Sequence, residues 1–200
     1  FALIGLPLGV QLTLLFADRI VRKFNFRLIL TIGIPLLSIS QCFAALMQSP
    51  YLFAGILIIG GASIAVIEVA VNLEADRVEA FLGKRIMNRS HAYWSFGFFG
   101  AGIIGAGFSQ IGISPFLHFV AITLFISIIT NLLFLDYIAA KPRRQSFPPQ
   151  KKVFVWPSKS IFFLVLFSLS AMLVEGASID WSVIFMRDIF NTVPLISGFS

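Results

Sequence analysis

The chain has 200 residues, of which 58% are hydrophobic and only 12% are charged. A soluble domain carries about a quarter charged residues and has too little interior to hide this much apolar surface, so the composition excludes a soluble globular fold. The formal net charge is +6. Its basic residues lie between apolar segments, which favours a membrane-topology signal over a nucleic-acid-binding surface.

Six apolar segments come close to the length of about 20 residues that a membrane-spanning helix needs. We expect an all-α polytopic membrane protein, because the strands of a membrane barrel would be shorter and would alternate apolar with polar residues. In chain order, the expected spans cover residues 1–17, 28–47, 51–74, 92–113, 116–137 and 161–184, and a seventh begins near Pro194.

Basic residues mark every second connection between these spans. Fourteen of the fifteen Lys and Arg residues fall in the stretches 18–27, 75–91 and 139–160, and the remaining one is Arg187. Because cytoplasmic loops carry the excess of Lys and Arg, these three stretches are predicted to be cytoplasmic. The chain would then begin outside, and since Phe1 is not an initiator Met, we expect one earlier span and a longer protein.

The stretch 139–160 differs in composition from the other connections. It has four Pro, six basic residues and no acidic residue, and such a sequence does not form a packed element. We expect a cytoplasmic linker held near the anionic inner leaflet. It would join a partial N-terminal transmembrane bundle, residues 1–138, to the start of a C-terminal bundle, residues 161–200.

Glu68 is the only charged residue of the third span before its last position, Glu74. A charge at that depth is costly to insert, which makes it a candidate functional group. Asn72 lies one turn further on, and the small residues Gly61 and Ala65 continue the same helix face. A carboxylate there can bind and release a proton as water access changes. The structural alternative is a Glu held by hydrogen bonds to a neighbouring helix.

Weaker candidates lie on other spans and could line the same cavity. The fifth span has a mild polar stripe that includes Ser127 and Asn131, which suits a hydrated wall and hydrogen bonds between helices equally well. Gln11 in the first span is a further candidate. His91, at the cytoplasmic edge of the fourth span, could relay protons or serve as a structural cap.

The fourth span is rich in glycine. Gly97, Ala101 and Gly105 repeat at four-residue spacing, a pattern that lets another helix backbone come close. We expect this face to pack against a neighbouring helix, and the same surface could slide during a conformational cycle.

The sixth span contains two acidic residues. Glu175, beside Gly176, lies slightly outward of the span centre and is a second candidate for proton or substrate contact. Asp180 is expected near the outer interface, either as an interfacial residue or as a partner of Arg187. The single Cys42 and two distant His residues offer neither a disulfide framework nor a metal site, so no metal and no cofactor are expected.

The connection after the first span resembles the signature loop of the major facilitator superfamily. Asp18-Arg19 is followed by Arg22, whereas Leu14 and Val21 stand where the family pattern has Gly. The resemblance implies that Asp18, Arg19 and Arg22 form a charge latch against the other half of a transporter.

Two longer stretches are similar to fucose-permease-like and YbjJ-like bacterial members of that family. One is 68–91, which opens with Glu68-Val-Ala-Val-Asn72, and the other is 175–188. The resemblance implies a proton-coupling role for Glu68, a weaker role for Asn72, and a chain that covers about helices two to seven of a twelve-helix protein. It also implies a multi-pass protein of the bacterial inner membrane, which we expect to be a monomer.

The leading hypothesis is a secondary active transporter of a small polar solute, driven by proton symport through alternating access. Its partners would be the solute, protons and the lipid bilayer. An efflux transporter that uses proton antiport and a non-transporting receptor or sensor remain open. An enzyme is not expected, because the acidic residues are scattered and no nucleophile–base pair is evident.

Overall fold

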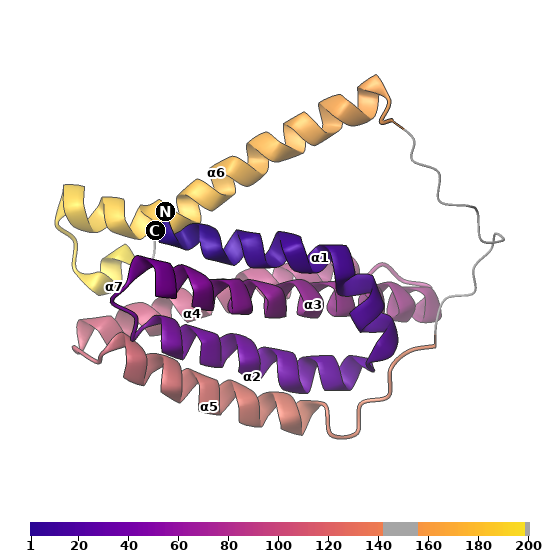
Figure 1. Ribbon diagram of the computed structural model, residues 1–200, viewed down its shortest axis with the longest axis horizontal. Coiled ribbons are helices and arrows are strands. Elements are labelled where there is room, and N and C mark those ends of the chain that lie inside the picture. The colour runs from indigo at the N-terminus through magenta and orange to yellow at the C-terminus, as the bar shows by residue number, and fades with distance from the viewer. Residues whose placement is uncertain (142–155, 199–200) are drawn as a thin grey trace. The chain divides into compact units, whose positions relative to one another are not determined.

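The computed structural model describes residues 1–141 and 156–198, and in these ranges the regular elements are helices (Figure 1). The expectation of an all-α chain is confirmed. A single 3-10 turn, Ala2–Ile4, leads directly into the first helix. The helices are, in chain order, α1 (Gly5–Lys23), α2 (Phe26–Ala44), α3 (Pro50–Leu82), α4 (Met87–Gln110), α5 (Pro115–Leu133), α6 (Lys159–Phe190) and α7 (Pro194–Ser197).

The chain divides into two compact units. The first comprises Phe1–Phe96 and Ile113–Arg143, and the second comprises Gly97–Gly112 and Arg144–Ser200. Helices α1, α2, α3 and α5 therefore belong to the first unit, and α6 and α7 belong to the second. Most of the predicted linker 139–160 lies outside the described residues, so the predicted bundle boundaries stay a prediction.

Capping side chains explain where several helices begin. The side-chain oxygens of Asn25, Ser114 and Ser158 accept hydrogen bonds from backbone N–H groups three residues later, at 2.7, 3.4 and 3.4 Å. Each bond satisfies one of the free donors at the start of α2, α5 or α6. Helix α3 ends at Leu82 and is capped by Gly83, whose φ of 63° is a left-handed conformation that favours glycine.

Two of the expected loops are shorter than the sequence suggested. Only residues 24–25 separate α1 from α2, so the expected loop 18–27 is mostly helical. Only residues 83–86 separate α3 from α4, in place of the expected loop 75–91. The prediction ended each span where the apolar sequence ended. Ala, Glu, Arg and Leu are strong helix formers, so the helices continue into charged sequence.

Five helices are long and apolar enough to cross a membrane by length and composition: α1 with its preceding turn, α2, α3, α5 and α6. They correspond to five of the six expected spans. The remaining one, the fourth expected span, corresponds to α4, which is helical and long enough but is not among the helices apolar enough to cross a membrane. Its Gly, Ser, Asn and Arg residues lower its mean hydropathy.

Helices α1 and α3 pack backbone to backbone at glycine residues. A Cβ atom at Gly5 would collide with the carbonyl group of Ala54, and one at Gly9 with the carbonyl group of Ile58. Gly61 lies equally close to the α1 backbone. The contacts Gly5–Ala54 and Gly9–Ile58 follow in the same order along both helices, so α1 and α3 run parallel. The expected topology requires this of the first and third spans, which both run inward from outside.

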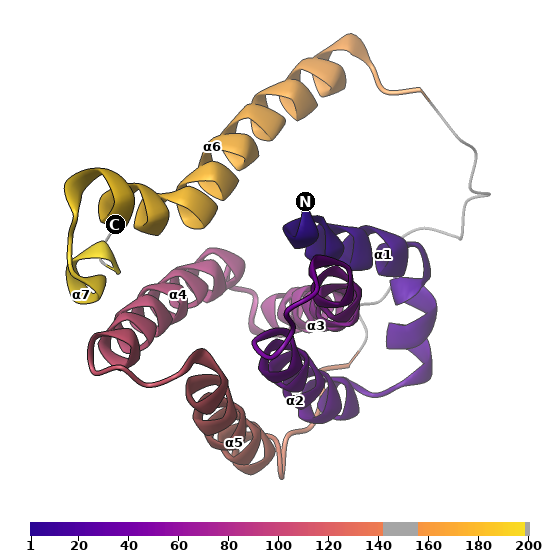
Figure 2. The same cartoon turned by 60° about the vertical axis from the view of Figure 1, so that its left-hand side comes forward.

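Helix α3 lies between α1 and α2, and α5 packs on the far side of α2 (Figure 2). At the contact of α2 with α3, a Cβ at Gly60 would lie 2.7 Å from the Ser40 hydroxyl oxygen. At the contact of α2 with α5, the Cys42 sulfur lies 3.3 Å from the Thr123 hydroxyl oxygen. Thr123, which lies four residues before Ser127 on the fifth span, thus serves helix packing.

The expected packing of the α4 glycine face is not found at Gly97, where a Cβ atom would meet nothing within 4 Å among the described residues. Further along α4, within the second unit, Gly102 and Ala106 lie against Gly198 at the end of α7. Small residues permit a close approach but do not supply the partner, and here the neighbour is the end of a short helix.

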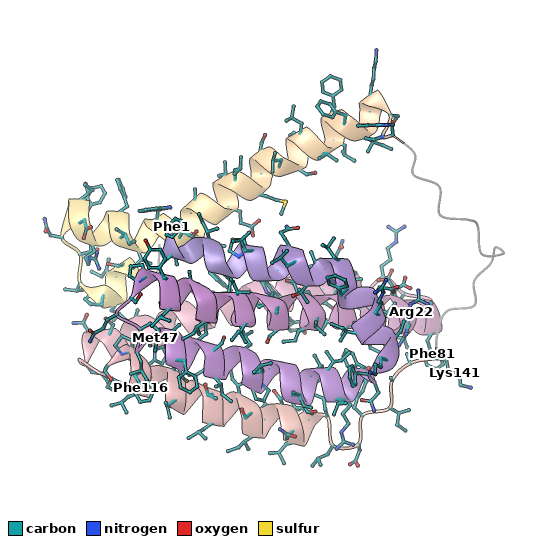
Figure 3. The ribbon with its side chains drawn as sticks, viewed as in Figure 1. Phe1, Arg22, Met47, Phe81, Phe116 and Lys141 are labelled. Carbon is teal, nitrogen blue, oxygen red and sulfur yellow. The ribbon has the colours of Figure 1, made fainter. Side chains whose placement is uncertain are left out.

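The basic connections of the first unit lie together at one end. Figure 3 labels Arg22, Phe81 and Lys141 at this end, and Met47 and Phe116 at the opposite one. Arg22 is near the end of α1, Phe81 is near the end of α3, and Lys141 follows α5. The structure therefore places the ends of the three helices that precede basic stretches on one side, in agreement with the predicted alternation.

Candidate functional site

Glu68 and Asn72 lie on α3 with exposed side chains, whereas Gly61 and Ala65 on the same helix line are buried. The common face that the spacing predicted is therefore packed in its first half and open in its second half. No other residue in the described ranges forms a hydrogen bond or ion pair with the Glu68 carboxylate. The alternative of a Glu held by a neighbouring helix finds no support in these ranges.

Glu74, six residues after Glu68, has the opposite environment. Only 3% of its surface is exposed. Its carboxylate accepts hydrogen bonds from the Tyr137 hydroxyl at 2.9 Å, from Arg77 Nη1 at 3.3 Å and from the backbone N–H of Ala140. A buried carboxylate is stable only when its charge is paired and its oxygens accept such bonds. Glu74 therefore fastens the chain after α5 to the end of α3.

An aromatic cluster holds the phenol ring of Tyr137 in place. The rings of Phe26 and Phe134 lie 5.8 Å apart, and each lies 5.3 Å from the Tyr137 ring. Burial, the hydrogen bond to Glu74 and the negative charge of Glu74 raise the pKa of Tyr137 to about 12. The phenol is therefore neutral at physiological pH and stays a hydrogen-bond donor.

The sequence predicted neither the burial of Glu74 nor its contact with Tyr137. The spacing of Glu74 and Arg77 is that of an ion pair on one helix, and this was the one available signal. Tyr137 is 63 residues away from Glu74 in sequence, and no short-range pattern points to such a contact.

The predicted latch residues lie at the C-terminal end of α1. Arg22 Nε lies 2.9 Å from Asp18 Oδ1, and the two side chains are 74% and 67% exposed. The Arg19 guanidinium lies 5.9 Å from the centre of the Phe16 ring. An exposed pair of this kind contributes at most about 0.5 kcal/mol. Asp18 and Arg22 can therefore separate and each pair with a different residue at little cost in free energy.

The remaining candidates of the first unit are exposed at the surface or form hydrogen bonds within their own helix. Gln11 on α1 and His91 on α4 are exposed. Asn131 is exposed, and its Nδ2 donates to the Ser127 carbonyl oxygen at 2.9 Å, whereas Ser127 is half-buried. Asn131 thus turns back on α5, while the neighbouring Thr130 is buried. In the described part of the chain, none of these four candidates forms a hydrogen bond or ion pair with Glu68.

Glu175 and Asp180 both lie on α6 in the second unit, where their side chains are exposed. The expected pairing of Asp180 with Arg187 is wrong: Arg187 Nε donates to Asp188 Oδ1 at 2.7 Å. Seven helical residues separate Asp180 from Arg187 by about 10 Å along the axis, so the adjacent carboxylate is the nearer partner. Over residues 1–141 and 156–198, no three His, Cys, Asp or Glu side chains cluster in a way that could hold a metal ion.

Two curated proteins are similar to this chain, and both are named as transporters. An uncharacterized MFS-type transporter of Yersinia pestis is 26% identical over 98% of this chain and 50% of its own length. An uncharacterized transporter of Sinorhizobium fredii is 29% identical over 62% of this chain and 33% of its own length. The chain thus spans about half the length of the first relative and a third of the second.

The first similarity supports membership of the major facilitator superfamily, and the name of the second relative is likewise that of a transporter. Together with the five apolar helices, they indicate a multi-pass membrane protein. No protein-family profile matches the chain, and no solved structure does.

Proposed function

We propose that this chain forms part of a secondary active transporter that moves a small polar solute by alternating access and proton symport. One observation carries the proposal: Glu68 lies inside an apolar helix, is exposed on the first unit and has no partner among the described residues. A proton carrier must gain and lose its proton in each cycle, so a permanent set of hydrogen bonds would disable it. Glu74 has such a set, and Glu68 does not.

Other residues receive roles in the same proposal. Asn72, one turn beyond Glu68 and also exposed, contacts the solute or the protonated carboxyl group. Glu175 serves as a second acidic group on the other half. The exposed latch residues (Asp18, Arg19 and Arg22) exchange their local contacts for the other half of the transporter. We also propose the fucose-permease-like subgroup, a monomer and a bacterial inner-membrane location.

The test uses the complete transporter with Glu68→Gln in proteoliposomes. A solute is first found by screening small polar compounds for thermal stabilisation, since a bound ligand stabilises the folded state. Accumulation of that labelled solute is then driven by a pH gradient. We expect Glu68→Gln to abolish gradient-driven accumulation and to preserve exchange of internal for external solute, because exchange needs no net proton movement.

The matched control is Asp188→Asn, which removes a carboxylate that is paired with Arg187 at the end of α6. It should accumulate solute like the unchanged protein. Undiminished accumulation by Glu68→Gln would refute proton coupling at this residue. Net movement outward in vesicles of defined orientation would favour efflux by antiport, and saturable binding without any flux would favour a receptor.

A further inference from the structure

We infer that the first unit carries a binding site for one anionic phospholipid. Its phosphate would lie in a basic cavity at the ends of α1 and α3, and one acyl chain would lie in an apolar groove between α1 and α2. Two cavities of the structure, which share a wall, lead to this inference.

The basic cavity has a volume of about 500 Å³. Three cationic side chains line it from three different segments: Arg22 on α1, Arg77 on α3 and Lys141 after α5. No acidic residue lines it. A cavity with three positive charges at the end of a membrane helix bundle suits a phosphate group at the bilayer surface.

The carboxylates that pair with these cations do not fully neutralise the positive charge of the cavity, so the cavity can bind a further anion. Glu74 neutralises Arg77 from outside the cavity lining, and Asp18 forms only an exposed surface pair with Arg22. Lys141 pairs with no acidic residue of the described chain. Arg77 is also fixed in place, since its guanidinium donates to the buried Glu74. The site therefore combines one preorganised cation with two mobile ones.

The apolar groove has a volume of about 550 Å³ and no charged lining residue. Leu28, Ile32 and Leu36 form its wall on α2, and Ile58, Ala62 and Val66 form its floor on α3. The one serine in the lining, Ser63, donates to the carbonyl oxygen of Ile59 on its own helix at 3.1 Å. Apart from Ser63 and Thr13, the lining side chains are apolar, so the groove offers an acyl chain a mostly apolar surface.

Phe24 lines both the basic cavity and the apolar groove, so the two lie next to each other. From Leu28 to Leu36 the groove follows α2 for about 12 Å, which is most of the ~15 Å thickness of one leaflet's hydrocarbon. A phospholipid has this same order of parts, an anionic group at the surface followed by an apolar chain. The alternative occupants match only one of the two sites: free phosphate would occupy the basic cavity alone, and another helix would occupy the apolar groove alone.

The headgroup test is native mass spectrometry of the complete transporter, comparing retained phosphatidylglycerol with phosphatidylcholine. In the unchanged protein we expect selective retention of phosphatidylglycerol. The double variant Arg22→Gln/Lys141→Gln should weaken phosphatidylglycerol binding by about fivefold for each cation removed. Its control, Lys23→Gln/Lys84→Gln, removes two exposed cations that lie outside the cavity lining and should leave retention unchanged. Equal losses in both double variants would overturn the site in favour of diffuse surface charge.

The groove test fills the acyl-chain path. Ala62→Phe should reduce phosphatidylglycerol retention at least fivefold, whereas Ala121→Phe, at an exposed position of α5 outside the groove, should not. A phosphatidylglycerol with a photoreactive acyl chain tests the same point in the unchanged protein, so the result does not depend on whether the Ala62→Phe variant folds. It should label the α2 segment that contains Ile32, and unlabelled phosphatidylglycerol should compete.

Two results would overturn the proposal. If millimolar inorganic phosphate displaces the lipid completely and Ala62→Phe has no effect, the cavity is a site for a free anion. If the photoreactive lipid labels other surfaces and leaves α2 unlabelled, the groove is covered by protein in the complete transporter.

Discussion

Glu68 and Glu74 lie on the same helix, about 9 Å apart along its axis. The carboxylate of Glu74 is buried and accepts three hydrogen bonds, while that of Glu68 is exposed and has no described partner. The same side chain is therefore a structural anchor at one position and a candidate proton carrier at the other. The difference comes from which neighbours reach each position and not from the residue type.

Tyr137→Phe tests the anchor at the residue scale. The substitution removes a donor from the buried Glu74 carboxylate and should cost about 1–3 kcal/mol of folding free energy near neutral pH. Because the pKa of Tyr137 is raised from 10.0 to about 12, the neutral phenol stabilises the fold fully below pH 10. This contribution is lost as pH rises from 10 toward 12. The difference in Tm between the two proteins should narrow over that range, measured by circular dichroism in detergent.

Tyr93→Phe serves as the control, because Tyr93 is 71% exposed and should have the same Tm as the unchanged protein at each pH. A Tm difference for Tyr137→Phe that stays constant from pH 9 to pH 12 would contradict the proposed role of the phenol.

Helix α3 is the central element of the first unit. It spans 33 residues, or about 50 Å, which exceeds the ~30 Å hydrocarbon thickness of a bilayer. Its first part packs on α1 through glycine, and its last turns carry the charged residues that fasten the segment after α5. One continuous helix therefore links Glu68, in the apolar part of α3, to the basic end of the unit.

Gly9→Ala tests the packing of this element. The added Cβ would collide with the carbonyl group of Ile58, so the helices must separate, and we expect a loss of about 1–3 kcal/mol in folding free energy. Gly55→Ala is the matched control on α3, where nothing lies within 4 Å of the new Cβ. There alanine should leave the Tm unchanged or raise it slightly, since it is the better helix former. Equal Tm values for the two variants would argue against close α1–α3 packing.

At the scale of the whole molecule, the charge distribution matches the helix directions. Helices α1 and α3 run parallel, and the end of the first unit that carries Arg22 and Lys141 is opposite the end with Met47 and Phe116 (Figure 3). This is the arrangement that a protein with basic cytoplasmic connections adopts.

Single-cysteine labelling tests the orientation. In a Cys42→Ala background, Gln48→Cys and Lys84→Cys place thiols at exposed positions, one after α2 and one after α3. A membrane-impermeant maleimide should label Gln48→Cys in right-side-out vesicles and Lys84→Cys only in inside-out vesicles. Labelling of both from the same side would contradict the predicted topology.

The sequence by itself determined the class of protein, the order of its helices and the alternation of basic connections. These properties follow from hydropathy and charge, which are sums over local stretches of chain. Helix ends were less predictable: the sequence placed the end of the third span at Glu74, but α3 continues to Leu82 because its charged turns still favour helix. The small-residue face of α4 predicted a helix partner that the described structure does not place at Gly97.

Only the tertiary structure decided which polar groups are paired and which are open. Glu74 became an anchor because Tyr137 and Ala140 return to it from the far end of α5. Glu68 stayed open because no described helix brings a partner to it. Contacts between residues distant in sequence depend on how helices pack against one another, and hydropathy and short-range spacing carry no information about them.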